Sequence, residues 1–254
     1  MAVEIGSLDR VTSIAGERGT GKSTFAIQDA RVFQRETGGY SIGHSPNGQV
    51  GHFSDVEFHS DVRKLLRGLR RHPEKHHFLV RGNPEEVLEV GVGLATAVRR
   101  RAHHERWLRF REDRPAPKGL KAPPVLVTID EGIRMRRRPT REELAWLEEL
   151  LVSARHKHLA VTWSIQAPSA RSWVLFEQSN RLRVFRYTHE WGLNALRAAG
   201  LPREVVPEIP ALERFEFFSW DKLAAGGRFA HLPAPSGGSA PEPDGRLKLV
   251  QSGG

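Results

Sequence analysis

Residues 16–23 read Gly-Glu-Arg-Gly-Thr-Gly-Lys-Ser, a complete G-x-x-x-x-G-K-[ST] pattern that decides how the rest of the sequence is interpreted. An apolar run precedes the pattern at Val11 to Ala15, and a helix-compatible stretch follows it from Thr24. The glycines allow the backbone to turn so that successive N–H groups point into a concavity. A strand, a glycine-rich loop and a helix in this order are typical of a phosphate-binding loop.

The loop predicts a site for a nucleoside triphosphate, and ATP is the expected ligand. The positive end of the following helix favours phosphate groups. Lys22 is the cation expected on the β- and γ-phosphates, and the hydroxyl of Ser23 is a candidate ligand of Mg²⁺. The candidate nucleotide-binding residues are Gly16, Glu17, Arg18, Gly19, Thr20, Gly21, Lys22, Ser23 and Thr24.

Apolar runs bounded by turn residues recur along the chain, with helical patterns between most of them. This alternation predicts an α/β fold whose central sheet is mostly parallel and carries helices on both faces. The expected strands lie at residues 11–15, 78–80, 125–129, 159–165 and 182–185.

Two helices are expected beyond the one that follows the loop. The first begins near Ser60 and is amphipathic, with three leucines on one side and four arginines on the other. The second runs from Pro84 to about Arg111 and ends in a basic segment. The amphipathic set comprises Leu65, Leu66, Leu69, Arg63, Arg67, Arg70 and Arg71.

Three stretches have the composition of irregular structure. Thr37 to Gly51 is rich in Gly, Ser, Asn and Pro, and Arg114 to Pro124 is rich in Pro and Lys, so both are predicted to be surface loops. From Pro233 onward few apolar residues remain. We therefore expect one ATPase domain over residues 1–232 and a flexible C-terminal tail over residues 233–254.

An acidic pair, Asp130 and Glu131, follows the apolar run at 125–129. Because the carboxyl ends of parallel strands share one edge of a sheet, Asp130 is expected beside the phosphate loop, where it can hold Mg²⁺ through water. Glu131 is placed to polarise a water molecule for attack on the γ-phosphate. The alternative interpretation is that the two acids only cap a helix.

Gln166 ends the next expected strand and precedes Ala167-Pro168-Ser169. A polar residue there can hydrogen-bond the γ-phosphate or the attacking water and report hydrolysis to the rest of the molecule. The same glutamine could instead simply begin a turn before Pro168.

Composition and charge indicate which kinds of partner the chain can bind. The 254 residues carry a formal net charge of +9, with arginine well in excess of lysine, which favours a polyanion such as nucleic acid. A GC-rich or heat-adapted source would produce the same excess. There is no cysteine, and the histidines have no clear zinc spacing. No apolar run spans a membrane and no signal peptide is recognisable, so we expect a cytosolic protein that is not an integral membrane protein.

These motifs, in this order, resemble those of the FtsK-HerA superfamily of DNA-pumping ATPases, and within it the genome-packaging ATPases of tailless icosahedral viruses and phages with an internal membrane. The resemblance extends over roughly residues 8 to 220. It rests on the phosphate loop, the Ile129-Asp130-Glu131 ending and the Trp163-Ser164-Ile165-Gln166-Ala167-Pro168-Ser169 ending. Members often have Thr before the glutamine, where this chain has Ile165.

The resemblance implies a RecA-like core that assembles into a ring, usually a hexamer, and drives double-stranded DNA through its channel by ATP hydrolysis. By motif position, Lys22 and Ser23 bind phosphate and Mg²⁺, Asp130 binds Mg²⁺, Glu131 is the base and Gln166 the sensor. An arginine supplied across the subunit boundary would stabilise the transition state. Arg155 is the first candidate for this arginine. Its rivals are Arg171, Arg183 and Arg186.

Two basic segments are candidates for DNA contact through the phosphate backbone. The first follows the acidic pair and contains Arg134, Arg136, Arg137 and Arg138. It could equally be a solvated basic loop or a contact to another protein. The second runs from Arg99 to Arg111 with Trp107 and Phe110 interleaved, although aromatic residues at such positions are more often part of a core.

The expected function is an ATP-driven translocase of double-stranded DNA that works as a homo-oligomeric ring and packages a viral genome. It would act in the host cytoplasm or on the virion at a packaging vertex, docked to a capsid or membrane vertex protein. One alternative is a cellular HerA-type ATPase that works with a nuclease on DNA ends. Another is a P-loop protein that does not translocate, such as a small-molecule kinase or a nucleotide-dependent switch.

Overall fold

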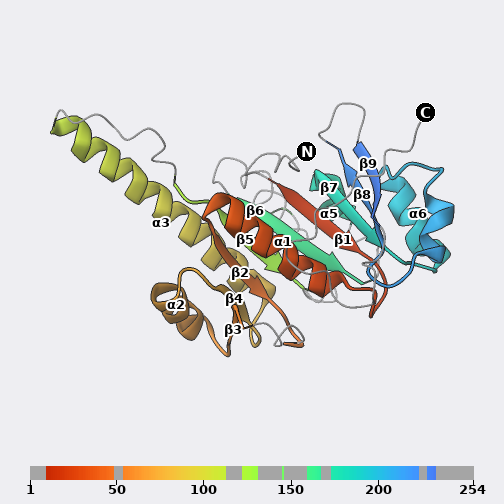
Figure 1. The fold of residues 1–254 in the computed structure, drawn as a ribbon, viewed down its shortest axis with the longest axis horizontal. Helices are drawn as coiled ribbons and strands as arrows, with labels where there is room; N and C mark the ends of the chain where they lie inside the picture. The colour runs from red at the N-terminus through yellow and green to blue at the C-terminus, as the bar shows by residue number, and fades with distance from the viewer. Residues whose placement is uncertain are drawn as a thin grey trace.

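The computed structural model describes residues 10–48, 54–112, 122–130, 145, 159–166, 173–222 and 228–232. These residues form a nine-stranded sheet of order β3-β4-β2-β5-β6-β1-β7-β8-β9, with helices on both faces (Figure 1). The predicted tail over residues 233–254 lies outside the described residues. The strands are β1 Val11–Ala15, β2 Tyr40–His44, β3 Val56–His59, β4 His76–Leu79, β5 Val125–Ile129, β6 Leu159–Ile165, β7 Arg181–Phe185, β8 Phe217–Asp221 and β9 Arg228–Leu232. The helices are α1 Lys22–Thr37, α2 Val62–Arg71, α3 Pro84–Arg111, α5 Trp173–Gln178, α6 Glu190–Ala198 and the 3-10 helix η3 Val206–Ala211.

Strands β3 through β7 in the sheet order are parallel, and β8 and β9 complete the sheet in antiparallel pairing. The prediction of a mostly parallel α/β sheet is therefore confirmed. Strand β6 lies between β1 and β5, with Val161 beside both Val11 and Val127. This order places the strand before the phosphate loop and the strand before Asp130 on either side of the strand that Gln166 follows.

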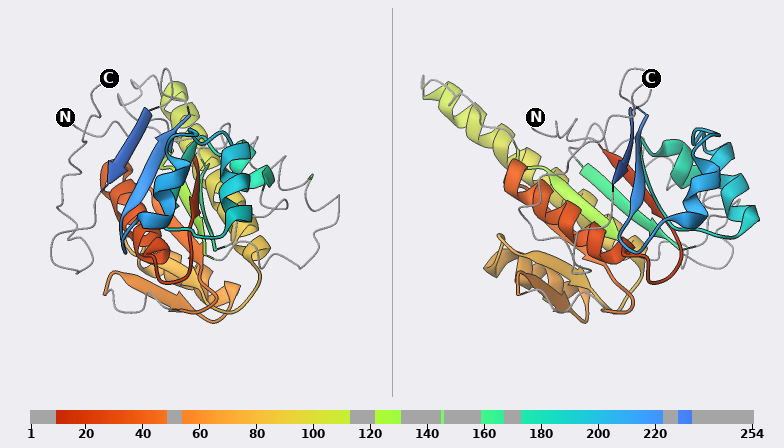
Figure 2. Two further views of the ribbon diagram at one scale, coloured as in Figure 1. Left: turned by 90° about the vertical axis from the view of Figure 1, so that its right-hand side faces the viewer. Right: turned by 45° about the vertical axis from the view of Figure 1, so that its right-hand side comes forward.

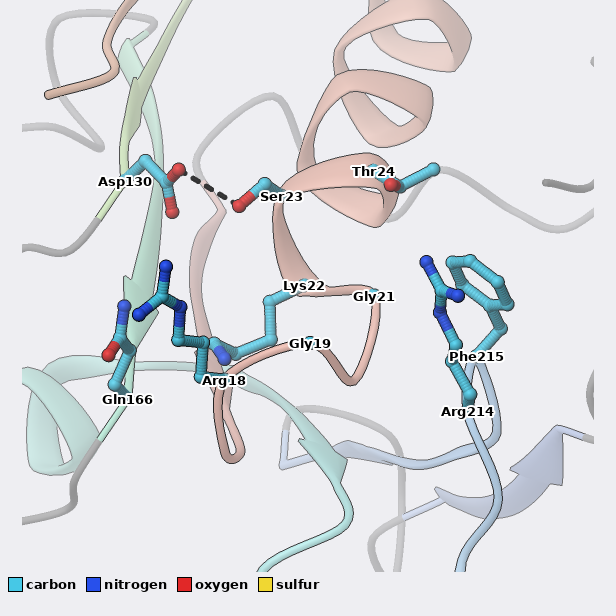
Figure 3. Close-up of a pocket in the computed structure, with 10 residues that line it drawn as sticks. All are labelled: Arg18, Gly19, Gly21, Lys22, Ser23, Thr24, Asp130, Gln166, Arg214 and Phe215. Carbon is cyan, nitrogen blue, oxygen red and sulfur yellow. Dashed lines mark hydrogen bonds between the residues drawn. The ribbon is translucent and has the colours of Figure 1, made fainter. Parts of the chain in front are cut away.

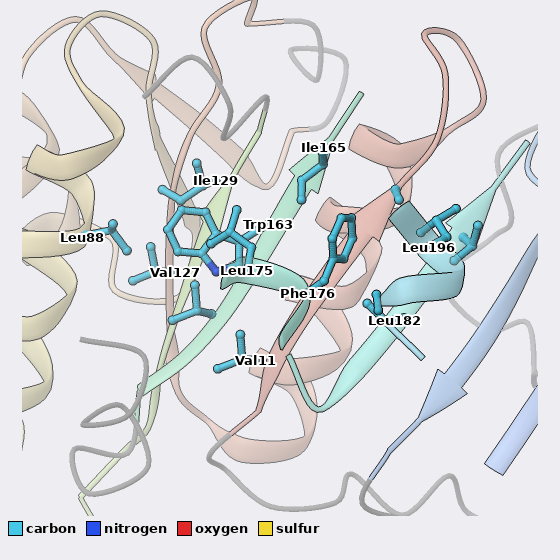
Figure 4. Packing of buried hydrophobic residues seen from close by; sticks show 14 of the residues in the cluster. Val11, Leu88, Val127, Ile129, Trp163, Ile165, Leu175, Phe176, Leu182 and Leu196 are labelled. Carbon is cyan, nitrogen blue, oxygen red and sulfur yellow. The ribbon is translucent and has the colours of Figure 1, made fainter. Parts of the chain in front are cut away.

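Each central strand is buried on both faces, and alternate residues pack on different helices. Leu126 and Ala160 pack on the α1 side with Ala30 and Phe33. Odd-numbered neighbours on β5 and β6 join the larger core on the opposite face, where α3, α5 and α6 lie (Figure 2). In that larger core Trp163 lies among valine, leucine, isoleucine and phenylalanine side chains (Figure 4). The labelled members are Val11, Leu88, Val127, Ile129, Trp163, Ile165, Leu175, Phe176, Leu182 and Leu196.

The prediction of a surface loop over 37–51 is wrong for its first half. Residues 40–44 form β2, which pairs with β4 on one side and β5 on the other and is buried from Ser41 onward. The strand is rich in small and polar residues because its neighbours approach closely. A Cβ atom on Gly43 would lie 2.4 Å from the Phe78 ring and 2.8 Å from the carbonyl oxygen of Thr128. Turn-like composition here reflects tight packing rather than exposure.

The predictions for α2 and α3 are close to the structure. On α2, Leu65 and Leu69 are buried as expected, whereas Leu66 is 41% exposed and lies outside the core. Helix α3 has the predicted bounds. Among the described residues, no helix has both the length and the apolarity to cross a membrane.

The C-terminal half of α3 leaves the body of the protein. Ala95 is the last residue of the helix that is described as buried, and the ribbon then projects past the sheet (Figures 1 and 2). Trp107 is 51% exposed, so the expectation that it belongs to the core is wrong. Arg111 lies over the Trp107 ring at 5.0 Å from its centroid. The projecting segment is therefore a cationic arm with an aromatic ring on its surface.

Candidate nucleotide-binding site

The glycine-rich loop connects β1 to α1 and is fixed by the ends of two neighbouring strands. The Gly16 N–H donates to the carbonyl of Ile165 at 3.2 Å, and the Glu17 N–H donates to the carbonyl of Arg186 at 3.0 Å. Sheet order places β6 and β7 on the two sides of β1, so one acceptor is the last residue of β6 and the other is the residue after β7. The loop is thus held at the carboxyl edge of the parallel sheet, where α/β proteins bind ligands.

Helix α1 begins at Lys22 with an open N-terminus. Its N-cap is Gly21, whose φ of 108° lies in the region that favours glycine. Among the described residues, no side chain caps this end and no acidic residue lies in the first turn. The first N–H groups of the helix therefore keep their capacity to bind an anion, and the helix dipole favours a phosphate group there.

The Lys22 side chain lies over the loop and is 6% exposed. Its ammonium donates to the carbonyl of Glu17 at 2.5 Å, and the Thr20 hydroxyl donates to the same oxygen at 2.9 Å. A phosphate oxygen is a stronger acceptor for an ammonium group than a peptide carbonyl is. The lysine is consequently placed to transfer its hydrogen bond to a bound polyphosphate.

Asp130 follows β5 and is 6% exposed. One carboxylate oxygen accepts a hydrogen bond from Ser23 at 2.9 Å, and the other accepts one from Ser164 of β6 at 2.8 Å (Figure 3). The pairing of a hydroxyl with a carboxylate brings together hard oxygen ligands of the kind Mg²⁺ prefers. The residues present thus fit a magnesium ion, and Ser164, which the sequence analysis did not single out, orients the carboxylate.

Gln166 and Arg18 line the same cavity as Asp130, on one side of the loop (Figure 3). The cavity has a volume of about 220 Å³. Its lining contains the predicted Gly19, Gly21, Lys22, Ser23 and Thr24 as well.

Two further lining residues, Arg214 and Phe215, were not predicted. They lie on the opposite side of the loop from Asp130 and Gln166 (Figure 3). The Phe215 N–H donates to the carbonyl of Thr20 at 2.9 Å, and a Cβ atom on Gly21 would lie 2.4 Å from the Phe215 ring. The Arg214 guanidinium stacks over that ring at 4.7 Å. The connection from η3 to β8 thereby contributes an aromatic wall to the cavity.

Glu17 ties the loop to the segment between β7 and α6. Its carboxylate accepts hydrogen bonds from the Thr188 backbone N–H at 2.7 Å and from the Thr188 hydroxyl at 2.5 Å. Partial burial works against the charged form, yet the bonds from Thr188 and the nearby Arg186 lower the pKa of Glu17 overall. The Glu17 side chain therefore supports the loop, and Glu17 is not among the described residues that line the cavity.

Several predicted site residues lie outside the described residues, so the structure does not place them: Glu131, Arg134, Arg136, Arg137, Arg138, Arg155 and Arg171. Of the rival trans arginines, Arg186 is exposed after β7. Arg183 is engaged inside its own chain, where its guanidinium donates to Ser219 and lies 5.9 Å from the Phe25 ring centroid. Burial lowers the pKa of Arg183 to about 10. Such a side chain cannot reach across a subunit boundary without leaving these partners.

Three features together define the class of protein. A phosphate loop lies between a strand and a helix, an acid follows a second strand, and a polar residue follows the strand between these two. The chain has the RecA-like α/β fold of the P-loop nucleoside triphosphatases.

Comparison with solved structures identifies the fold more closely. The chain is similar to the genome packaging NTPase B204 of Sulfolobus turreted icosahedral virus 2 bound to AMPPCP, with a TM-score of 0.61 and 14% sequence identity over 90% of this chain and 100% of that one. For the sulfate complex of the same protein these values are 0.62 and 13% over 90% and 98%. For B204, the DNA-packaging ATPase of Sulfolobus turreted icosahedral virus, they are 0.59 and 15% over 89% and 98%. No family model matches the sequence, and none of the curated proteins does. At 13–15% identity the likeness is one of fold.

Proposed function

We propose that this chain hydrolyses ATP to move double-stranded DNA, and that it packages a viral genome. The observation that carries the proposal is the convergence of Lys22, Ser23, Asp130 and Gln166 on one cavity. These residues come from three adjacent strand ends, in a fold similar to that of B204, which is named as a packaging NTPase. The formal charge of +9 is the complement of a polyanionic substrate.

The residues of the chain divide the work of hydrolysis. Lys22 would move from the Glu17 carbonyl to the β- and γ-phosphates, and Ser23 with Asp130 would hold Mg²⁺. When bound, the ion neutralises charge that develops on the phosphates. Glu131, the residue after Asp130, would polarise the attacking water, and Gln166 would hydrogen-bond that water or the γ-phosphate.

The nucleotide base would lie against Phe215. A polyphosphate that starts beside Asp130 and Gln166 and follows the loop past Thr24 emerges on the side of Arg214 and Phe215 (Figure 3). An aromatic ring stacks on the face of any base, and the guanidinium above it restricts the ring's movement. The wall therefore supports affinity for nucleotides without reading the identity of the base.

Work on DNA requires assembly and a contact with the polyanion. We assign the trans arginine to Arg155, with Arg171 and Arg186 as its rivals, and we expect a ring of six. The arginines at 134 and 136–138 and the cationic arm of α3 are the proposed DNA contacts. A capsid or membrane vertex protein would dock the ring, either in the host cytoplasm or on the virion.

The decisive experiment measures ATP hydrolysis by the purified full chain with Mg²⁺, with and without linear duplex DNA. Wild type should hydrolyse ATP faster when duplex is present. Glu131→Gln should bind ATP as wild type does and lose about 10²–10⁴-fold in turnover, because a positioned base contributes about that much. Lys22→Ala should lose ATP binding itself, which separates the two roles.

Ring formation and movement need their own measurements. Mass photometry with a non-hydrolysable analogue and duplex should give a closed oligomer, and displacement of a triplex-forming strand should report translocation. A chain that stays monomeric under these conditions argues for the nucleotide-dependent switch. Transfer of the γ-phosphate to a small metabolite, in place of release as inorganic phosphate, identifies the kinase alternative.

A further inference from the structure

A second ligand cluster lies at the opposite end of the sheet from β9. Strand β3 is the outer strand, and β4 pairs with it so that Glu57 lies beside His77 and His59 beside Leu79. Glu57, His59 and His77 share the face that α2 covers. The sequence does not reveal that these three residues lie together, because the two histidines are on separate strands with the α2 helix between them.

We propose that Glu57, His59 and His77 form a binding site for Zn²⁺ that is separate from the nucleotide site. Nε2 of His59 lies 2.9 Å from Nδ1 of His77, and the nearer Glu57 oxygen lies 3.8 Å and 3.7 Å from these two atoms. Ligands about 2.0–2.1 Å from a tetrahedral zinc ion lie about 3.3 Å from one another. The three atoms thus already approximate one face of a zinc tetrahedron.

The hydrogen-bond partners of His77 and Glu57 leave a lone pair of each directed at the centre of the cluster. Nε2 of His77 is 2.8 Å from the carbonyl of His72, which can only accept, so this nitrogen carries the proton and Nδ1 keeps its lone pair. Lys75 donates to one Glu57 oxygen at 2.9 Å and leaves the other toward the imidazoles. Such partners fix the tautomer and orientation of zinc ligands in known sites.

Room for the two imidazoles comes from α2. A Cβ atom on Gly68 would lie 2.5 Å from His59 and 2.9 Å from His77, so only glycine fits over the stacked rings. The His77 side chain is fully buried, while those of His59 and Glu57 are 12% and 25% exposed. The cluster therefore opens to solvent on one side, where a water molecule can be the fourth ligand.

Without a bound ion, the two imidazoles form a hydrogen bond with each other. His59 then donates its Nε2 proton to Nδ1 of His77, and zinc would bind the other neutral tautomer of His59, in which the proton lies on Nδ1. Two imidazoles and one carboxylate favour zinc over Mg²⁺, which prefers oxygen ligands. A bound ion would link the outer strand to β4 and so reinforce the exposed edge of the sheet.

The test titrates the chelator-stripped full chain with Zn²⁺ against a chromophoric indicator, without nucleotide, so that it is independent of ATPase activity. Wild type should bind one equivalent tightly. His59→Gln and Glu57→Gln should each weaken that equivalent by tenfold or more. His103→Gln, on the exposed arm of α3, is the control and should bind like wild type.

Cobalt provides the second readout, because tetrahedral Co²⁺ with nitrogen ligands absorbs visible light intensely. Wild type and His103→Gln should give this spectrum, and His59→Gln should not. Both ligand variants keep a polar side chain at a partly exposed position, and circular dichroism checks that they fold. Equal zinc affinity in wild type and His59→Gln, or no binding by wild type above the level of the variants, would overturn the proposal.

Discussion

At the residue scale, Gly21 and Phe215 depend on each other. Gly21 provides the left-handed N-cap of α1, and its missing side chain leaves the space that the Phe215 ring fills. Phe215 itself has a φ of 69°, which is uncommon for a residue with a bulky side chain. Backbone strain of this kind costs about 1–3 kcal/mol and persists where surrounding structure enforces it, often at ligand sites.

The first prediction concerns the Phe215 ring. Phe215→Ala should raise KM for ATP by about tenfold, because stacking of a base on an aromatic side chain contributes about 1–3 kcal/mol. Phe215→Trp keeps an aromatic face and should stay within a few-fold of wild type. Steady-state kinetics and equilibrium binding of a fluorescent ATP analogue measure both. An unchanged dissociation constant in Phe215→Ala would place the base elsewhere.

At the element scale, the sequence predicts elements well where hydrophobic periodicity and the packing environment agree. Strands β1, β5, β6 and β7 contain clusters of apolar residues, and they were predicted to within a residue or so. Strand β2 was missed because its residues include Ser41 and Gly43, which have low β-propensity. These small residues allow the neighbouring strands to pack closely. Strands β3, β8 and β9 were not predicted either, because short strands near a sheet edge carry weak periodicity.

The second prediction tests the position of β2. Gly43→Val should destabilise the protein by about 1–3 kcal/mol or more, since its side chain would enter the Phe78 ring and the backbone of β5. Gly93→Ala, where nothing lies within 4 Å of an added Cβ atom, is the control and should keep or raise stability, because alanine is about 1 kcal/mol more favourable than glycine inside a helix. Urea denaturation at constant pH measures both. A stable Gly43→Val protein would mean that β2 is not between β4 and β5.

The third prediction concerns the ion pair that ties α1 to the start of β3. The hydrogen bonds from Arg31 to Asp55, at 2.6 Å and 2.5 Å, hold the pKa of Asp55 below its usual value despite partial burial. A carboxyl with a lowered folded-state pKa stabilises the fold fully above its unfolded pKa, about 3.9. That contribution is lost as pH falls through the folded-state pKa.

Asp55→Asn should accordingly be less stable than wild type at neutral pH, and the difference should shrink toward zero well below pH 4. The free energy of unfolding is measured across this range with a chelator present, so that metal binding does not contribute. Glu36→Gln, an exposed carboxylate on α1, is the control. A difference that stays constant down to pH 2 would contradict the assignment.

At the scale of the whole molecule, the site is an outcome of sheet order. Lys22, Asp130 and Gln166 follow three strands whose carboxyl ends meet at one edge, and a parallel α/β pattern is enough to predict that meeting. Phe215 could not be predicted in this way. It reaches the loop from the turn before β8, and nothing in its local sequence encodes either a positive φ or a contact with Gly21.

The last prediction is that the arginines of the projecting arm of α3 bind the phosphate backbone of DNA. Beyond Ala95, none of the described residues of α3 is buried. Residues 99–111 carry six arginines and one glutamate, so this part of the helix contributes little to the stability of the fold. Phosphate contacts release counterions, so each lost contact reduces the slope of log affinity against log salt by about one. Replacing Arg100, Arg101 and Arg106 with glutamine should weaken duplex binding and flatten this slope.

Replacing Arg63, Arg67 and Arg70 on the exposed face of α2 removes the same charge and should leave the slope close to wild type. Fluorescence anisotropy across a salt series distinguishes the two, and equal slopes for both triple variants would show that only net charge matters.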